Sequence, residues 1–215
     1  MACPPAALGA ETTFNHLPWT QYWTAPPHVN TATFDVYGGE GATSIYFPDS
    51  PGGLGGRATA TIHVVPGQKY SIYVGDQGRL RDPMLLSSEG GEGSEVGTGS
   101  TRLIAAGGGA GGPTGGAGGT PGPFGSPING GTTGYSEGVG AGGFSWGPPS
   151  TKYEVGVRSG EGLVTVSYDP DTFIKSGPRG LTNDATPTFS FATNRGGTSF
   201  QCFDEFTFGL SLIHI

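Results

Sequence analysis

The amino-acid sequence predicts an all-β fold, and three observations point to it. Glycine and proline account for 43 and 18 of the 215 residues, and in a helix interior they cost about 1 and about 3 kcal/mol relative to alanine. No window of helical length that lacks both residues carries the apolar spacing of an amphipathic helix. Several short segments instead alternate apolar and polar residues, which is the period of a half-buried strand.

The alternating segments predict four strands of a small sandwich. They are residues 31–37, 58–64, 70–74 and 163–168. Between the second and the third, Pro66-Gly67 favours a type II turn, so we expect these two strands to form a hairpin. One face would be apolar and would need a second sheet to cover it. The inward-facing side chains would be Ala32, Phe34, Val36, Ala58, Ala60, Ile62, Val64, Tyr70, Ile72, Val74, Val164, Val166 and Tyr168.

The middle of the chain has a different composition. Residues 107–147 contain 19 glycines in 41 positions, many of them three residues apart. Three residues per turn is the period of the extended polyproline-type helix, which has no internal hydrogen bonds. Its backbone groups must therefore bond to neighbouring segments or to water. The alternative interpretation is a flexible glycine linker. A linker seldom contains aromatic residues, and this stretch contains four: Phe124, Tyr135, Phe144 and Trp146.

The predicted strands and the glycine-rich stretches together resemble the glycine-rich domain. This domain occurs in bacterial surface and secreted proteins and in the anaplastic lymphoma and leukocyte receptor tyrosine kinases. The resemblance covers residues 12–168 and implies a jelly-roll-like β-sandwich similar to tumour necrosis factor, with an inserted bundle of polyglycine-type extended helices at 89–148. The segments on which this resemblance depends are residues 22–26, 32–41, 53–62, 65–75, 103–109 and 162–168.

A second resemblance begins at Ser176, after an expected linker at 169–180. Residues 176–191 and 198–202 are similar to the opening of bacterial immunoglobulin-like repeats, with strands expected near 186–192 and 198–203. We therefore expect an incomplete immunoglobulin-like segment at 181–209. The resemblance implies that Cys202 forms a disulfide with a partner missing from this fragment, in an oxidising, extracellular setting.

The end of the chain carries a further expectation. Residues 210–215 read as Leu-Ser-Leu-Ile-His-Ile, which looks like the translated end of a sequencing adaptor. We expect these six residues to be an artefact that carries no information about the fold.

Charge and hydropathy exclude two classes of partner. The chain has a net charge of −7, and its 10 basic residues are scattered singly. A nucleic-acid-binding surface needs clustered Lys and Arg, so we expect no nucleic-acid partner. No apolar run reaches the length of about 18 residues that a membrane span needs, so we expect no membrane span in this fragment.

The catalytic and metal-binding patterns in the sequence lack the structural context that such sites need. The G-x-S-x-G pattern of a nucleophile elbow appears at residues 134–138 and 143–147, but the elbow requires a following helix. Residues 90–96 come near a calcium-binding nonapeptide in a single copy, whereas such sites need stacked repeats. We expect no catalytic residue, no metal and no cofactor.

The sequence thus predicts a non-catalytic extracellular binding or adhesion module of a bacterial cell-surface or secreted protein. Its ligand-binding residues would be Phe124, Tyr135, Phe144 and Trp146, which stand among residues without side chains and would contact an unknown protein or glycan. Two alternatives remain open. One is a structural spacer or matrix protein, and the other is a ligand-binding ectodomain fragment of a receptor resembling the receptor tyrosine kinases.

Overall fold

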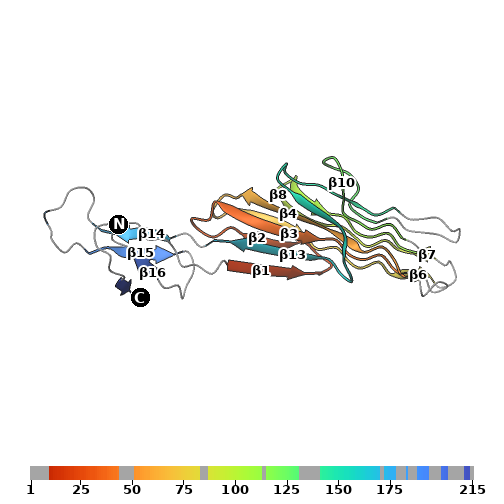
Figure 1. Cartoon of the computed structure of the whole chain (residues 1–215), viewed down its shortest axis with the longest axis horizontal. Coiled ribbons are helices and arrows are strands. Elements are labelled where there is room, and N and C mark those ends of the chain that lie inside the picture. Colours follow the sequence, from red (N-terminus) through yellow and green to blue (C-terminus); the bar gives the residue numbers. More distant parts are fainter. Residues whose placement is uncertain are drawn as a thin grey trace.

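The computed structural model shows an all-β chain (Figure 1). It describes residues 10–43, 51–82, 87–112, 115–130, 141–169, 172–177, 183, 188–193, 200–202 and 211–213. Within these ranges the chain forms strands, turns and extended segments, and no helix is present. Across the same residues, nothing has the form of a membrane-spanning helix.

Two antiparallel sheets form a β-sandwich. The five-stranded sheet has the order β1-β13-β3-β4-β12, and the four-stranded sheet has the order β2-β5-β8-β9. The strands of the first are β1 (Ala10–Asn15), β13 (Leu163–Tyr168), β3 (Thr31–Tyr37), β4 (Gly55–His63) and β12 (Lys152–Arg158). Those of the second are β2 (Gln21–Thr24), β5 (Lys69–Tyr73), β8 (Ser94–Thr98) and β9 (Thr101–Ala106).

One hydrophobic core fills the space between the sheets. Trp23 of β2 packs between the two layers. Its ring centroid lies 5.8 Å from that of Phe34 in the opposite sheet and 5.6 Å from that of Tyr70 in the same sheet. Aromatic pairs of this kind contribute about 0.5–1.5 kcal/mol beyond the burial of their area. The other buried core residues are Ala25, Val29, Ala32, Val36, Ala58, Ala60, Val64, Ile72, Val74, Val96, Ile104, Ala106, Val164 and Val166.

The predicted alternation is confirmed, but the predicted hairpin is wrong. The apolar faces of residues 31–37, 70–74 and 163–168 point into the core as expected. Gly67 forms the turn with φ of 78°, yet β4 and β5 belong to different sheets. Both strands direct their apolar side chains into the same core, so the turn carries the chain from one layer to the other instead of folding it back within one.

Four small sheets of two strands each complete the described structure. They are β6 (Leu80–Asp82) with β7 (Ser87–Ser88), β10 (Thr120–Pro121) with β11 (Phe144–Ser145), β14 (Thr172–Ser176) with β15 (Ser190–Thr193), and β16 (Phe200–Cys202) with β17 (Ser211–Ile213). Strand β14 occupies part of the segment where the sequence predicts a linker. The immunoglobulin-like assignment of residues 181–209 and the disulfide of Cys202 stay predictions.

An ion-pair network covers the outer face of the five-stranded sheet. Arg57 contacts Asp35 through two hydrogen bonds of 2.7 and 2.9 Å and Glu154 through one of 2.5 Å. Burial alone would raise the pKa of Asp35, but the hydrogen bonds from Arg57 and Thr59 and the charge of Arg57 outweigh it and lower the pKa. Because the folded-state pKa is depressed, Asp35 stabilises the fold above its ordinary pKa of 3.8 and loses this contribution as the pH falls through the depressed value.

Replacing Asp35 by Asn tests this contribution. We expect the variant to lose about 1–2 kcal/mol of unfolding free energy at neutral pH, since charge-assisted hydrogen bonds are replaced at a partly exposed site. The loss should shrink as the pH falls through the depressed pKa, because the wild-type carboxyl is then neutral too. Urea unfolding at a series of pH values measures this loss of unfolding free energy, and Glu11→Gln on the exposed face of β1 is the control. A loss that is independent of pH would contradict the assignment.

Candidate functional site

Glycine-rich segments extend the strands of both sheets beyond the sandwich. Residues 38–42 follow β3, 51–54 precede β4, 89–93 precede β8 and 107–112 follow β9. Figure 1 shows these segments running side by side from the sandwich towards β6 and β7. The two sheets, which face each other across side chains in the core, therefore continue into one array of extended backbone.

The segment 107–112 lies inside this array. The N–H of Gly109 donates to the carbonyl oxygen of Gly39 at 2.9 Å, and its carbonyl accepts from the N–H of Gly91 at 2.7 Å. A strand in a sheet bonds only to the strands on its two sides, whereas this segment bonds in more directions. Its backbone partners belong to residues 38–42, 52–56, 89–93, 115–119, 127–130 and 142–145.

Glycine is required because the backbones of the array are in direct contact. A Cβ at Gly38, at the end of β3, would overlap the carbonyl oxygen of Gly107, which follows β9 in the opposite sheet. A Cβ at Gly109 would overlap the carbonyl oxygen of Gly53. The obstacle is backbone in both cases, so no side-chain rotation can make room.

Gly109→Ala tests the contact. We expect it to lower the unfolding free energy by about 2–4 kcal/mol, through overpacking and loss of the backbone hydrogen bonds of the segment. Gly67→Ala is the matched control: nothing lies within 4 Å of its Cβ position, so only its positive φ opposes the substitution, at about 1 kcal/mol. Chemical denaturation compares the two, and equal losses would show that the array tolerates side chains at its centre.

The predicted ligand-binding aromatics have different environments. Phe124 is 70% exposed and Phe144 is 38% exposed, whereas Trp146 is 1% exposed. The ring centroids of Phe124 and Trp146 are 4.5 Å apart. The buried Trp146 ring therefore packs against the exposed Phe124 ring and offers little surface of its own. Its indole Nε1 is buried with no hydrogen-bond partner among the described residues. Tyr135 lies outside the residues that the structure describes.

Backbone hydrogen bonds hold the loop that carries Phe124. The N–H of Gly122 donates to the carbonyl of Ser145 at 2.9 Å, and the N–H of Phe144 donates to the carbonyl of Pro127 at 2.8 Å. Trp146 and Ala105 of β9 exchange two further bonds, of 3.1 and 2.9 Å. We call the exposed side chains of Phe124 and Phe144 the aromatic surface. The bonds to Ala105 join the segments that carry them to the sandwich, and bonds of Ile128 and Gly143 with Gly108 join them to the array.

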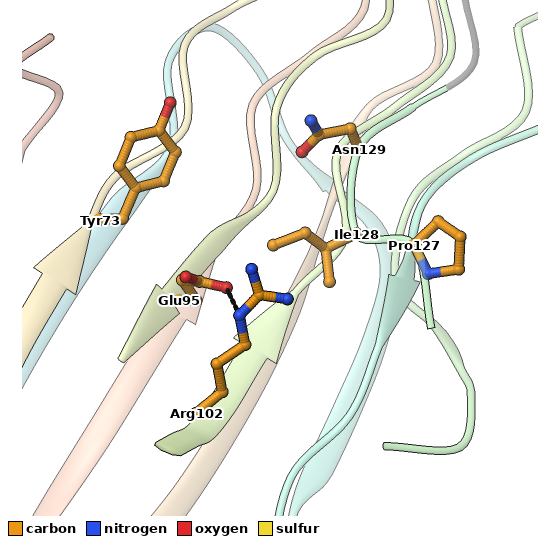
Figure 2. A pocket seen from close by; sticks show the side chains of 6 residues that line it. All are labelled: Tyr73, Glu95, Arg102, Pro127, Ile128 and Asn129. Atoms are coloured by element: carbon orange, nitrogen blue, oxygen red, sulfur yellow. Dashed lines mark ion pairs between the residues drawn. The ribbon is translucent and has the colours of Figure 1, made fainter. Parts of the chain in front are cut away.

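A groove of about 370 Å³ lies on the outer face of the four-stranded sheet, where this same loop passes over it. Figure 2 shows Tyr73 of β5, Glu95 of β8 and Arg102 of β9 on the strand side, with Ile128 and Asn129 directed towards them from the loop. The sixth lining residue is Pro127. The amino-acid sequence does not predict this groove, because its residues come from four separate segments and share no recognisable spacing.

Burial shapes the electrostatics of the groove. Burial raises the pKa of Glu95, and the Arg102 guanidinium, whose Nε lies 2.9 Å from Oε2 of Glu95, only partly offsets the effect. Tyr73 donates a hydrogen bond to Glu92. Burial, this hydrogen bond and the nearby carboxylate charges together raise the pKa of Tyr73 to about 12, so the phenol is neutral at physiological pH.

Glu95→Gln tests whether burial dominates at this carboxylate. A raised folded-state pKa means that the ionised form opposes folding, and that stability is lost as the pH rises through the raised value. We therefore expect the variant to be more stable than the wild type at neutral pH, by less than about 1 kcal/mol at this half-buried site, and the gain to vanish at acid pH. Thermal unfolding from pH 4 to 8 measures it. A less stable variant at neutral pH would mean that the attraction to Arg102 prevails.

Comparison with protein-family models and curated proteins assigns no family to this chain. The chain matches no protein-family model, and no curated protein is significantly similar to it. Among the residues that the structure describes, no three His, Cys, Asp or Glu side chains gather in a way that could hold a metal ion. The array, the aromatic surface and the groove are therefore the features that bear on function.

Proposed function

We propose that the chain is a non-catalytic binding or adhesion module of an extracellular protein, in which a rigid backbone array presents the aromatic surface to a partner. The observation that carries the proposal is the exposure of Phe124 on a loop held by backbone hydrogen bonds. An exposed aromatic ring on a fixed support loses little conformational entropy when it binds. Aromatic residues are also enriched at protein interfaces.

We further propose that the array is a bundle of polyglycine-type helices carried by a jelly-roll-like sandwich. In a helix of three residues per turn, successive N–H groups point to different sides. The several bonding directions of segment 107–112 support this geometry. The proposal includes membership of the glycine-rich domain of bacterial surface and secreted proteins, an extracellular location and the start of an immunoglobulin-like repeat after the sandwich.

The second candidate function is a structural spacer. The extended form of the array favours it, since laterally bonded backbone can set a distance between two parts of a longer protein without contacting a ligand (Figure 1). In a spacer, the exposed aromatics would have no specific partner. The two functions therefore differ in what happens when Phe124 and Phe144 are removed.

The experiment uses beads coated with the whole chain and allowed to settle on cultured epithelial cells. We expect retention above that of uncoated beads, and a loss of at least tenfold in apparent affinity for the Phe124→Ala/Phe144→Ala double variant, about 1.4 kcal/mol. Trp19→Ala is the control, since Trp19 is 60% exposed outside the loop. Retention that the double variant leaves unchanged would refute the aromatic surface, and retention no higher than that of bare beads would favour the spacer.

A further inference from the structure

The groove beneath loop residues 127–129 is a second candidate binding site, separate from the aromatic surface. None of its six lining residues belongs to that surface. Its volume of about 370 Å³ lies at the lower end of the range of about 300–1,000 Å³ for small-molecule pockets. The sandwich and the loop form its walls, so the groove exists only because the loop lies against the outer face of the sheet.

Hydrogen-bonding groups in the groove exceed the bonds that they make within the chain. A guanidinium has five N–H donors, and in the described structure only Nε of Arg102 has a partner, Glu95. Asn129 uses Oδ1 to accept from the N–H of Gly93 at 2.9 Å, while its Nδ2 makes no bond to any described residue. The phenol oxygen of Tyr73 donates to Glu92 and keeps its acceptor capacity.

The charges that line the groove cancel. Glu95 is the lining carboxylate and Arg102 the lining guanidinium, and the two form an ion pair. A charged ligand placed here would lose hydration without meeting an uncompensated opposite charge, which makes its transfer costly. The lining therefore favours an uncharged ligand with many hydrogen-bonding groups.

Apolar surface completes the lining. Ile128 and Pro127 supply aliphatic area from the loop, and the Tyr73 ring supplies an aromatic surface from the sheet (Figure 2). An uncharged ligand that fits must show C–H groups to these side chains and hydroxyl groups to Arg102 and Asn129. Pyranose rings have this combination, with C–H bonds on their faces and hydroxyls at their edges.

We propose that this groove binds a neutral saccharide, with Arg102 and Asn129 donating to its hydroxyl oxygens and Ile128 and Tyr73 packing against its C–H groups. The groove is preformed, because several of these groups are held before any ligand arrives. The carbonyl of Ile128 accepts from the N–H of Gly108 at 2.8 Å, and Gly93 fixes the amide of Asn129. Preorganisation of this kind reduces the entropy lost on binding.

The test titrates the isotope-labelled chain with a panel of sugars and follows its amide resonances by NMR. The neutral probes are glucose, galactose, mannose, N-acetylglucosamine and disaccharides of these, each up to about 10 mM, a concentration that reveals affinities near 1 mM, or about −4 kcal/mol. Glucuronate and glucosamine are the anionic and cationic comparisons. We expect at least one neutral sugar to shift resonances in residues 93–102 and 127–130 and to bind more tightly than both charged probes.

Two variants assign the site. Arg102→Met should weaken binding at least tenfold, and Arg102→Lys, which keeps the charge but loses the planar fork of donors, should weaken it at least threefold. The second variant serves if the first does not fold. Arg79→Met is the matched control, since Arg79 is an exposed arginine paired with Asp76 outside the groove lining. Phe124→Ala should leave sugar binding unchanged, which separates this site from the aromatic surface.

Three results would overturn the proposal. The first is the absence of resonance shifts with every neutral sugar in the panel. The second is binding that both Arg102 variants leave at wild-type strength, and the third is a preference for glucuronate or glucosamine. None of these bears on bead retention through Phe124, so either proposal can fail while the other stands.

Discussion

Direct hydrogen bonding between glycine backbones of opposite sheets underlies the architecture of this chain. In the sandwich, the side chains of Phe34, Trp23 and their neighbours keep the two layers apart, as in sandwiches generally, where the layers lie about 10 Å from each other. Beyond the ends of β3 and β9 the chain consists mostly of glycine, so few side chains separate the two layers. There the N–H of Gly109 reaches the carbonyl of Gly39, across what would be the core, at 2.9 Å.

This transition explains how the two parts stabilise each other. The sandwich has a conventional hydrophobic core and sets the positions of the strands that lead into the array. The array has almost no side chains to bury, so its stability must come from backbone hydrogen bonds, each worth only about 1 kcal/mol net. Many such bonds at fixed spacing are needed, and the strands of the sandwich provide that spacing by delivering several segments already aligned.

The proposed binding function depends on the side chains that the array supports. Glycine segments alone offer a partner little beyond backbone, so recognition requires side chains held at the edge of the array. The loop at 122–130 supplies them on two sides, with Phe124 exposed and Ile128 and Asn129 over the outer face of the sheet. Such a loop would be flexible in isolation. Its bonds to Ser145, Gly108 and Gly93 fix it here.

The sequence predicted the sandwich better than the sites. Alternation at Ala32, Phe34 and Val36 identified core positions because strand period and burial are local properties. The connection through Gly67 was mispredicted, since a turn residue specifies local geometry but not which sheet the next strand joins. The glycines at 38–41 and 52–53 belong to the array although they lie far from the glycine-rich middle of the chain. Their position next to predicted strands was the available signal. The groove had none, because only the tertiary fold brings Tyr73, Arg102 and Asn129 together.

Amide hydrogen exchange resolved to single residues tests whether the glycine backbones of the array are hydrogen-bonded in solution. We expect the N–H groups of Gly91, Gly108 and Gly109 to exchange slowly, with protection comparable to that of core strand residues such as Val96 and Ile104. Gly91 and Gly109 donate to backbone inside the array, and Gly108 donates to the carbonyl of Ile128 in the loop that lies against it. Exchange of these glycines at random-coil rates, while the sandwich strands stay protected, would show that the glycine segments are not bonded to one another in solution.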